Sequence, residues 1–323
     1  MKIKTPAIAV VAAIGSTISI SSAAQQWPDK PVRILVPFPP GGGTDIQARL
    51  LSSEFQKRMG QNFIIDNRTG ASGIIAAQLA VASPPDGNTI LFTSGSISVV
   101  ATLFAKQMKF DVYKDLQPVS WISSTPLVLS LHPSVPAKSV KELIGLAKRT
   151  SAGMNAGGNS TGSTAHLTAE MFNQTFGVKS TVLTYRGGGP AVIALIAGEI
   201  DYIFATAPSI MPHLNVGRAK ALAVTTPKRS SVLPDLPTMS SMYPGFEADN
   251  WYAMFFPAGT PSEIVSRLNT EIRNALGTEE IKKFLQREAL EPVASSPADL
   301  STLLKREIEK YAKVIKAANI TVQ

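Results

Sequence analysis

The segment Val32–Gln47, VRILVPFPPGGGTDIQ, contains the most informative pattern of this chain. Its first five residues, Val32–Val36, form an apolar run that predicts a buried strand. The run leads into a loop with three consecutive glycines, and Thr44 with Gln47 then has the spacing of a capping box at a helix start. A strand, a glycine loop and a helix start in this order direct unpaired backbone N–H groups at an anion. The loop matches neither the Walker A pattern nor the dinucleotide fingerprint GxGxxG.

Three further loops have the same arrangement, with a strand before them and a helix after them: Gly157–Gly162, Tyr185–Pro190 and Thr69–Gly73. Small hydroxyl side chains accompany the first and the last of these loops. A single loop of this kind is more often ordinary turn chemistry. Four of them favour a binding cleft, because the ligands of open α/β sheets gather at the carboxyl ends of strands.

Apolar runs and amphipathic segments alternate from Val32 to Val224, which predicts an α/β fold with a largely parallel sheet. Three helices with little strand between them are expected from Thr260 to Ala318. We expect two α/β lobes, with the chain crossing near Thr125 and returning near Lys228. The predicted division is a first lobe of residues 25–125 and 229–323, and a second lobe of residues 126–228.

Residues 1–24 have the pattern of an export signal peptide. Lys2 and Lys4 precede an apolar stretch, Ala7–Ile20, and small residues before Gln25 allow cleavage near Ala24. The chain therefore is expected to be periplasmic, and no later run is long enough to span a bilayer. The formal net charge is +8, but the basic residues are scattered, so we expect no nucleic-acid partner.

The composition excludes disulfides and metal sites built from cysteine thiolates. The chain has no cysteine, and its three histidines, His132, His166 and His213, lie far apart without metal-type spacing. We expect no metal and no cofactor. His166 is expected to cap a helix, to line a cleft, or to be a structural histidine whose hydrogen bonds are satisfied within the fold.

An enzymatic interpretation rests on Gly158–Gly162, which matches the GxSxG nucleophile elbow of serine hydrolases. Ser160, Asp201 and His213 follow in the chain order of that fold. The context argues against it, because the preceding segment is small and polar and Asp201 opens a strand instead of following one. An α/β serine esterase that uses Ser160 is the alternative function.

Several other residues have competing roles. Asp45 lies in the first turn of its helix, where it either favours the helix dipole or holds the loop shape. For Trp251 and Tyr252, core packing is favoured over stacking on a ligand.

The ordered motifs resemble those of the Bug family, the receptors of tripartite tricarboxylate transporters. The similarity is carried by Pro37–Asp45, Asn67–Gly73, Ser163–Leu167 and Tyr185–Ala191, and it covers essentially the whole chain after the leader. The resemblance implies a type II periplasmic binding fold, whose two lobes are joined by two crossing strands. It also implies closure on a small carboxylate without catalysis, with the carboxylate held mainly by main-chain N–H groups and ordered waters.

The chain departs from the family pattern at three positions: Thr69 replaces a common proline, Ala205 a common aspartate and Arg186 a common lysine. An aspartate in this region meets the ammonium group of amino-acid ligands in some members. Ala205 and Thr206 have no charge for that task. We therefore expect a ligand without a cationic amine, either a di- or tricarboxylate or an aromatic acid, and Arg186 is a candidate contact for a distal acid group.

The sequence thus predicts a monomeric, extracytoplasmic solute-binding receptor that is not an enzyme. Its expected partners are a small organic carboxylate and the membrane permease subunits of a tripartite tricarboxylate transporter. The predicted ligand-binding residues are Phe38, Pro40, Gly41, Gly42, Gly43, Thr44, Ser72, Ser94, Ser96, Ser160, Thr161, Gly162, Ser163, Thr164, His166, Tyr185, Arg186, Gly187, Ala205 and Thr206.

Overall fold

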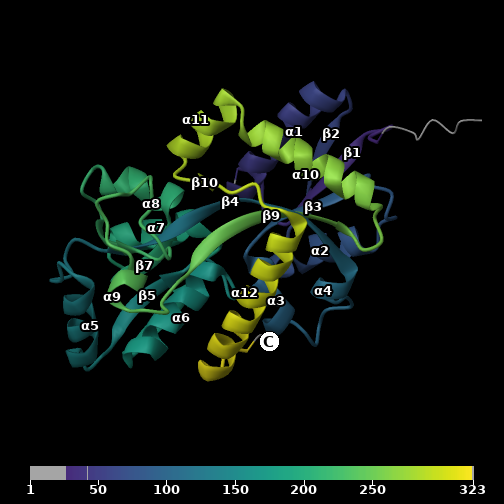
Figure 1. Ribbon diagram of the computed structural model, residues 1–323. Helices are drawn as coiled ribbons and strands as arrows, with labels where there is room; N and C mark the ends of the chain where they lie inside the picture. The colour runs from purple at the N-terminus through teal and green to yellow at the C-terminus, as the bar shows by residue number, and fades with distance from the viewer. Residues whose placement is uncertain (1–26, 42, 322–323) are drawn as a thin grey trace, which may run out of the picture.

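The computed structural model describes residues 27–41 and 43–321, so the predicted signal peptide and Gly42 lie outside the described residues. Figure 1 shows an elongated molecule of two lobes: one holds the early strands together with the C-terminal helices, and the other holds the middle of the chain. Within the described ranges, no helix combines the length and the apolar composition that a membrane crossing requires.

A mixed sheet passes through both lobes, because the long strand β4 belongs to both. The strand order is β2-β1-β3-β9-β4-β7-β5-β6, and β8 and β10 also pair with β4. In the first lobe, β1 pairs in parallel with β2 and β3, and the antiparallel strand β9 lies between β3 and β4. The strands of this lobe are β1 (Val32–Val36), β2 (Phe63–Asn67), β3 (Thr89–Ser94), β4 (Leu116–Leu131), β9 (Asp249–Pro257) and β10 (Glu291–Pro292).

Both faces of the first-lobe sheet are buried, which explains why β1 is a nearly continuous apolar run. Val32, Ile34 and Val36 pack in one cluster with α1 and α10, while Leu35 packs in another with α2 and α3. The helices of this lobe are α1 (Gly43–Met59), η1 (Ala71–Gly73), α2 (Ile74–Val81), α3 (Ser96–Leu103), α4 (Val112–Asp115), α10 (Ser262–Leu276) and α11 (Glu279–Arg287).

The second lobe repeats the principle around parallel strands β5, β6 and β7, with the end of β4 pairing antiparallel to β7 and β8. Its strands are β5 (Met154–Gly158), β6 (Ser180–Thr184), β7 (Tyr202–Thr206) and β8 (Lys220–Val224). Its helices are α5 (Val140–Arg149), α6 (Thr164–Phe176), α7 (Gly188–Ala197), α8 (Ala207–Leu214) and α9 (Met239–Met242).

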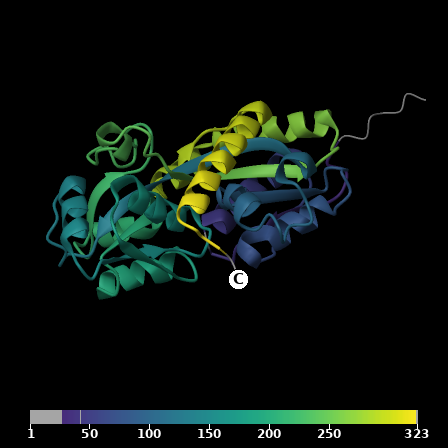
Figure 2. The same ribbon diagram turned by 90° about the horizontal axis from the view of Figure 1, so that it is seen from below.

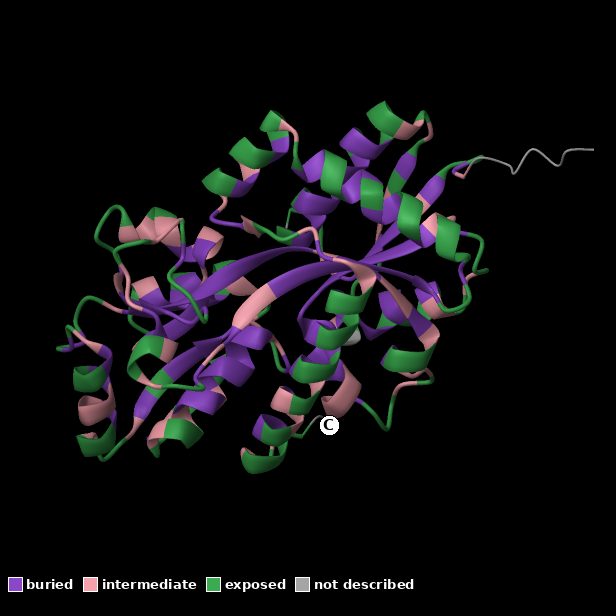
Figure 3. Ribbon diagram, viewed as in Figure 1, coloured by how far each residue is buried: buried purple, intermediate pink, exposed green. Residues whose placement is uncertain are grey.

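Strands β4 and β9 cross between the lobes as an antiparallel pair that ends with Pro126 opposite Asp249. Figure 3 shows these two strands as a mostly buried band through the centre of the molecule. Met239, Phe246 and Ala248 pack in the cluster that also contains the α5 and α6 side chains. We therefore propose that the chain returns to the first lobe at the start of β9 and not near Lys228.

The C-terminal helix α12 (Pro297–Ala317) lies across the junction of the lobes, as both ribbon views show (Figures 1 and 2). It begins at a capping box of Ser296 and Asp299. Its first half packs Leu300 and Leu303 into the first lobe, and its second half packs Tyr311 into the second-lobe cluster. This helix consequently contacts both lobes.

The element predictions were most accurate in the early strands and helices. The bounds predicted for β1 are confirmed, and the helix predicted from Thr44 begins one residue earlier, at Gly43. The predicted strand Leu127–Leu131 is only the end of β4, and β9 was not predicted. The predicted pair of crossing strands is confirmed.

Candidate functional site

The loop between β1 and α1 is held by the buried carboxylate of Asp45. The Gly41 N–H donates to Asp45 Oδ2 at 2.9 Å, and Arg49 Nε donates to the same oxygen at 2.9 Å. Asn67 Nδ2 donates to Asp45 Oδ1 at 2.9 Å and to the Phe38 carbonyl at 2.9 Å. Of the two roles considered for Asp45, the structure therefore shows loop support directly.

The charge of Asp45 is stabilised in the fold. Burial alone would raise the pKa of this carboxyl group, but the hydrogen bonds from Arg49, Gly41 and Asn67 outweigh burial and hold the pKa below 3.8. Asp45 is 2% exposed. At neutral pH it is a permanent anion whose oxygen atoms are directed at the loop and away from any ligand.

The predicted capping box between Thr44 and Gln47 is wrong. Gln47 Nε2 donates to the Gly43 carbonyl at 3.2 Å, and Gln47 Oε1 accepts from Ser123 Oγ at 2.6 Å. Gly43 itself approaches Tyr252 so closely that an added Cβ would lie 3.0 Å from the tyrosine hydroxyl. The α1 N-terminus is thus positioned by contacts with β4 and β9.

The corresponding loop of the second lobe connects β5 to α6, and Ser163 caps the helix. The Ser163 hydroxyl accepts from the N–H groups of His166 at 3.2 Å and of Ser160 at 3.3 Å. The Gly162 N–H donates to His166 Nδ1 at 3.1 Å. The amides of Ser160 and Gly162 are therefore engaged within the loop, contrary to the expectation that they are free for a ligand. Thr164 and Ala165 occupy the first helical positions, whose N–H groups have no partner within a helix.

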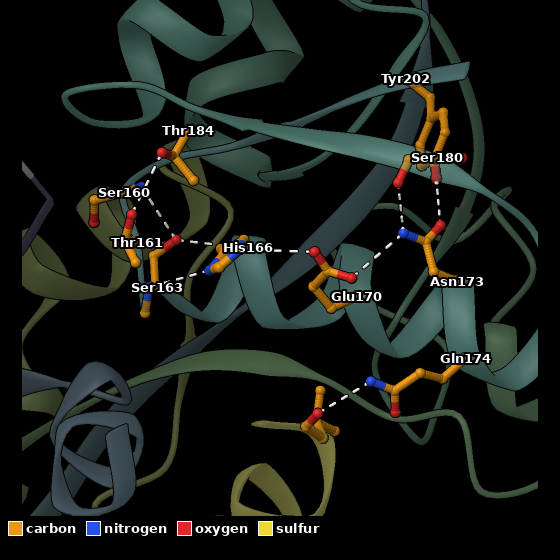
Figure 4. A network of polar contacts seen from close by, with 12 residues as sticks. Ser160, Thr161, Ser163, His166, Glu170, Asn173, Gln174, Ser180, Thr184 and Tyr202 are labelled. Carbon is orange, nitrogen blue, oxygen red and sulfur yellow. Dashed lines mark hydrogen bonds and ion pairs between the residues drawn. The ribbon is translucent and has the colours of Figure 1, made fainter. Parts of the chain in front are cut away.

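His166 supports this loop from behind, as Figure 4 shows. Burial lowers its pKa to about 4, so the ring is neutral at neutral pH. Because Nδ1 accepts from Gly162, the proton is on Nε2, which lies 3.9 Å from Glu170 Oε1. Of its expected roles, the structure supports that of a structural histidine, because the buried ring accepts from Gly162 and holds the loop.

A cleft of about 620 Å³ lies between the lobes. The wall includes most of the predicted ligand-binding residues: Phe38, Pro40, Gly41, Gly43, Thr44, Ser72, Ser94, Ser96, Ser160, Gly162, Ser163, Thr164, Arg186, Gly187 and Thr206. The α1 N-terminus enters from the first lobe and the α6 N-terminus from the second. Residues far apart in the sequence therefore meet around one space, and their contact with a ligand stays a prediction.

Four predicted residues lie outside this wall. Ala205 is 1% exposed and packs in the cluster with α7 and α8, because alternate β7 side chains point to opposite faces. Tyr185 packs against the same cluster, His166 lies behind its loop, and Thr161 is directed at Thr184.

The sequence reasoning missed several wall residues, which are Asn159, Pro208, Ser209, Asn250, Tyr252 and Glu288. Asn250 and Tyr252 come from β9, so only the unpredicted strand placement brings them here. Asn159 follows β5 directly, and the preference of polar residues for strand ends is the signal that would have found it.

The charge of the cleft wall is nearly neutral. Among its described residues, Arg186 is the one Lys or Arg and Glu288 the one carboxylate. Arg186 has no ion-pair partner within the described part of the chain, whereas Glu288 Oε1 accepts from Arg287 Nε at 2.9 Å. Near Arg186, Thr206 and Ser209 share a hydrogen bond of 2.8 Å between their hydroxyls. The second lobe thus offers hydrogen bonds and one positive charge to an anion.

A hydrogen bond between residues of the two lobes lies at the rim of the cleft. Ser72 Oγ donates to the Thr161 carbonyl at 3.2 Å. Ser72 has a φ of 54° beside Gly73, so this serine is held in the left-handed region. The contact lies where movement of one lobe toward the other would form or break it.

The geometry does not support the hydrolase alternative. The carboxylate of Asp201 accepts from the Asn155 N–H at 2.7 Å, and His213 lies in the last turn of α8. In the described part of the chain no hydrogen bond links Ser160, Asp201 and His213. Among those same residues, no cluster of three or more His, Cys, Asp or Glu could hold a metal ion.

The fold and the cleft define a class of protein: a two-lobed, periplasmic-type solute-binding protein. Residues 47–320 match the profile of the tripartite tricarboxylate transporter family receptor, and the chain belongs to this family. The family consists of binding proteins, so the prediction that the chain is not an enzyme is confirmed.

Relatives agree over nearly the full length. Protein BugT of Bordetella pertussis is 33% identical over 316 residues, which cover 97% of this chain and 97% of BugT. The structure of R. palustris Rpa4515 with adipate has a TM-score of 0.81 and 36% identity, and covers 91% of this chain and 99% of that one. MatC from Rhodopseudomonas palustris with bound malate has a TM-score of 0.77 and 30% identity, with 90% and 100% covered.

Proposed function

We propose that this chain is an exported receptor that captures a small organic acid with at least two carboxylate groups and delivers it to a membrane permease. The observation that carries the proposal is the pair of helix N-termini, α1 and α6, that face one cleft from opposite lobes. Backbone N–H groups at helix starts favour anions through both hydrogen bonding and the helix dipole. The relatives crystallised with adipate and malate support this ligand class.

The first carboxylate would bind at the amides of Thr44, Thr164 and Ala165. A second acid group would lie toward Arg186, the cation without an ion-pair partner in the described cleft wall. A charge-assisted hydrogen bond contributes about 1.5–3 kcal/mol, so Arg186 would favour a diacid over a monoacid of equal size by roughly tenfold or more. A diacid that carries an aromatic ring also fits the proposal, because Phe38 and Tyr252 line the same space.

An amine-bearing ligand is disfavoured in this proposal. Ala205, where the family resemblance implies an aspartate, is buried in the second-lobe core. Glu288 is the acidic wall residue, but its carboxylate already accepts from Arg287. An ammonium group would therefore lack an unengaged carboxylate.

The location and the partners follow from the same proposal. The leader would be cleaved near Ala24, and the mature chain would act in the periplasm as a monomer. Closure on the ligand would change the relative position of the lobes about β4 and β9, and a permease would recognise that closed form.

Native mass spectrometry of the purified chain, followed by thermal shifts with adipate, malate, citrate, benzoate and glutamate, tests the proposal. A diacid should raise the melting temperature most. Arg186→Gln should weaken the diacid by about tenfold and leave a monoacid nearly unchanged. Arg149→Gln, on the exposed end of α5, is the matched control. Stabilisation by glutamate alone would refute the assignment of the ligand class.

A further inference from the structure

A cluster of two acidic side chains, of which Glu307 is buried and Asp249 is partly exposed, lies near the start of α6. Asp249 opens β9 opposite Pro126, at the point where the lobes join. The next residue, Asn250, lines the cleft, and its Oδ1 accepts from Thr164 Oγ1 at 3.5 Å. Since side chains alternate along a strand, Asp249 is directed away from the cleft, toward α12.

Helix α12 supplies the other half of this cluster. Glu307 is 1% exposed, and its Oε2 lies 2.7 Å from Lys310 Nζ. Arg306 Nε lies 3.5 Å from Glu307 Oε1. Tyr311 is fully buried, with Lys310 Nζ 4.6 Å from its ring centre, and its hydroxyl has no hydrogen-bond partner in the described structure. The Thr164 side chain lies near this hydroxyl.

The charges around Asp249 come from a small set of groups. Burial and then the negative charge of Glu307 raise the pKa of Asp249 to about 6, Lys310 and Arg306 oppose the rise, and Glu247 adds to it. Tyr311 faces the same pair and is neutral, because burial raises its pKa well above 10. From β4 and α6, the facing residues Pro126 and Thr164 do not titrate.

We infer that Asp249, which with Glu307 forms an acidic pair, takes up a proton when an anion occupies the nearby α6 N-terminus. The inference rests on the proposed function. A carboxylate at the Thr164 amide adds negative charge near Asp249, and that added charge favours protonation of the Asp249 carboxyl group. Coupling is reciprocal, so protonation of the pair strengthens ligand binding. Tyr311 faces both the acidic pair and the Thr164 side chain.

The expected size follows from linkage. If the bound anion raises the pKa of Asp249 by one unit from about 6, the affinity rises about sixfold between pH 7.5 and pH 5.5, and about half a proton is taken up per ligand at pH 6.5. His166 does not contribute in this range, because its pKa is about 4.

Isothermal titration calorimetry with adipate and malate, in two buffers of different ionisation enthalpy at pH 6.5, measures this uptake. The wild-type chain should take up about half a proton per ligand. Asp249→Asn should abolish the uptake and flatten the affinity between pH 7.5 and 5.5, whereas Asp235→Asn, on an exposed loop, should retain both. Tyr311→Phe should reduce the pH dependence while the chain stays folded.

The outcomes separate the two proposals. Binding of a diacid by the wild-type chain without proton uptake would overturn the proton linkage and leave the proposed function intact. Uptake that persists in Asp249→Asn and in Glu307→Gln would also overturn it. Failure of every acid to bind would overturn both. A carboxyl resonance that titrates near pH 6 in the unliganded chain and is lost in Asp249→Asn would support the pair independently of any ligand.

Discussion

Replacing Asp45 by Asn tests the idea that a buried carboxylate shapes the first anion-binding loop. In Asp45→Asn, Oδ1 still accepts from Asn67, but an amide NH₂ replaces the oxygen that accepts from Gly41 and Arg49. The bond to the Gly41 amide is worth about 1.5–3 kcal/mol as a charge-assisted hydrogen bond. Arg49 is 54% exposed, so its ion pair adds only about 0.5 kcal/mol.

The free energy of unfolding should therefore fall by about 2–3 kcal/mol, which corresponds to roughly 3–5 °C in melting temperature for a chain of this size. Diacid affinity should fall at least tenfold, because the Gly41 loop no longer holds its amides in place. The pKa of Asp45 is lowered from 3.8 in the fold. Its contribution to the free energy of unfolding is therefore present above pH 3.8 and is lost as the pH falls through the lowered pKa of the folded state. The deficit of the variant should thus disappear in strong acid.

Calorimetric unfolding and isothermal titration with adipate measure both effects. Arg49→Gln is the matched control, since it removes only the exposed half of the network and should cost about 0.5 kcal/mol. If Asp45→Asn unfolds and binds like the wild-type chain, or loses no more than the Arg49 control, then the carboxylate does not support the loop and the reasoning fails.

Three further predictions follow from the cleft. Ser72→Ala removes the Ser72–Thr161 hydrogen bond between the lobes, so diacid affinity should fall by about three- to tenfold. Small-angle scattering should show an increased radius of gyration. An unchanged affinity would refute a role of this hydrogen bond in closure of the lobes. His166 has a pKa lowered from 6.5 to about 4, so the free energy of unfolding should fall by up to about 3 kcal/mol as the pH falls from 6.5 to 4. The free energy of unfolding of His166→Gln should lack this pH dependence, and an equal pH dependence in the variant would contradict the assignment. Ser160→Ala should bind diacids with an affinity within about threefold of the wild type, because the Ser160 N–H and not its hydroxyl is engaged in the loop. Intact mass spectrometry after fluorophosphonate treatment should show no adduct on the wild-type chain.

Local signals in the sequence predicted the parts of the site that depend on neighbouring residues. The apolar run Val32–Val36 and the glycines after it predicted the first strand and the loop before α1. These signals operate over four or five residues, so no tertiary information is needed to recognise them.

Other parts of the site could not be predicted from these short-range signals, because they depend on contacts between distant segments. Gly162 was expected to offer its amide to a ligand, but His166 accepts that hydrogen bond. Ala205 was expected at the site, but it faces the α7 and α8 core. Which face a strand residue occupies depends on register with its neighbours, and a one-residue shift reverses it.

The sequence by itself determined the class of this protein, because repeated strand–glycine–helix motifs predict an α/β fold with loops at the strand ends, and the order of these motifs resembles that of the family. Only the tertiary structure decided which amides stay available, which residues form the cleft wall and which charges are buried. Insertion of β9 between β3 and β4 brings Asn250 and Tyr252 to the cleft, and the passage of α12 across the junction buries Glu307 beside Asp249. Burial and electrostatic energy depend on contacts between segments that are hundreds of residues apart, and no local pattern encodes them.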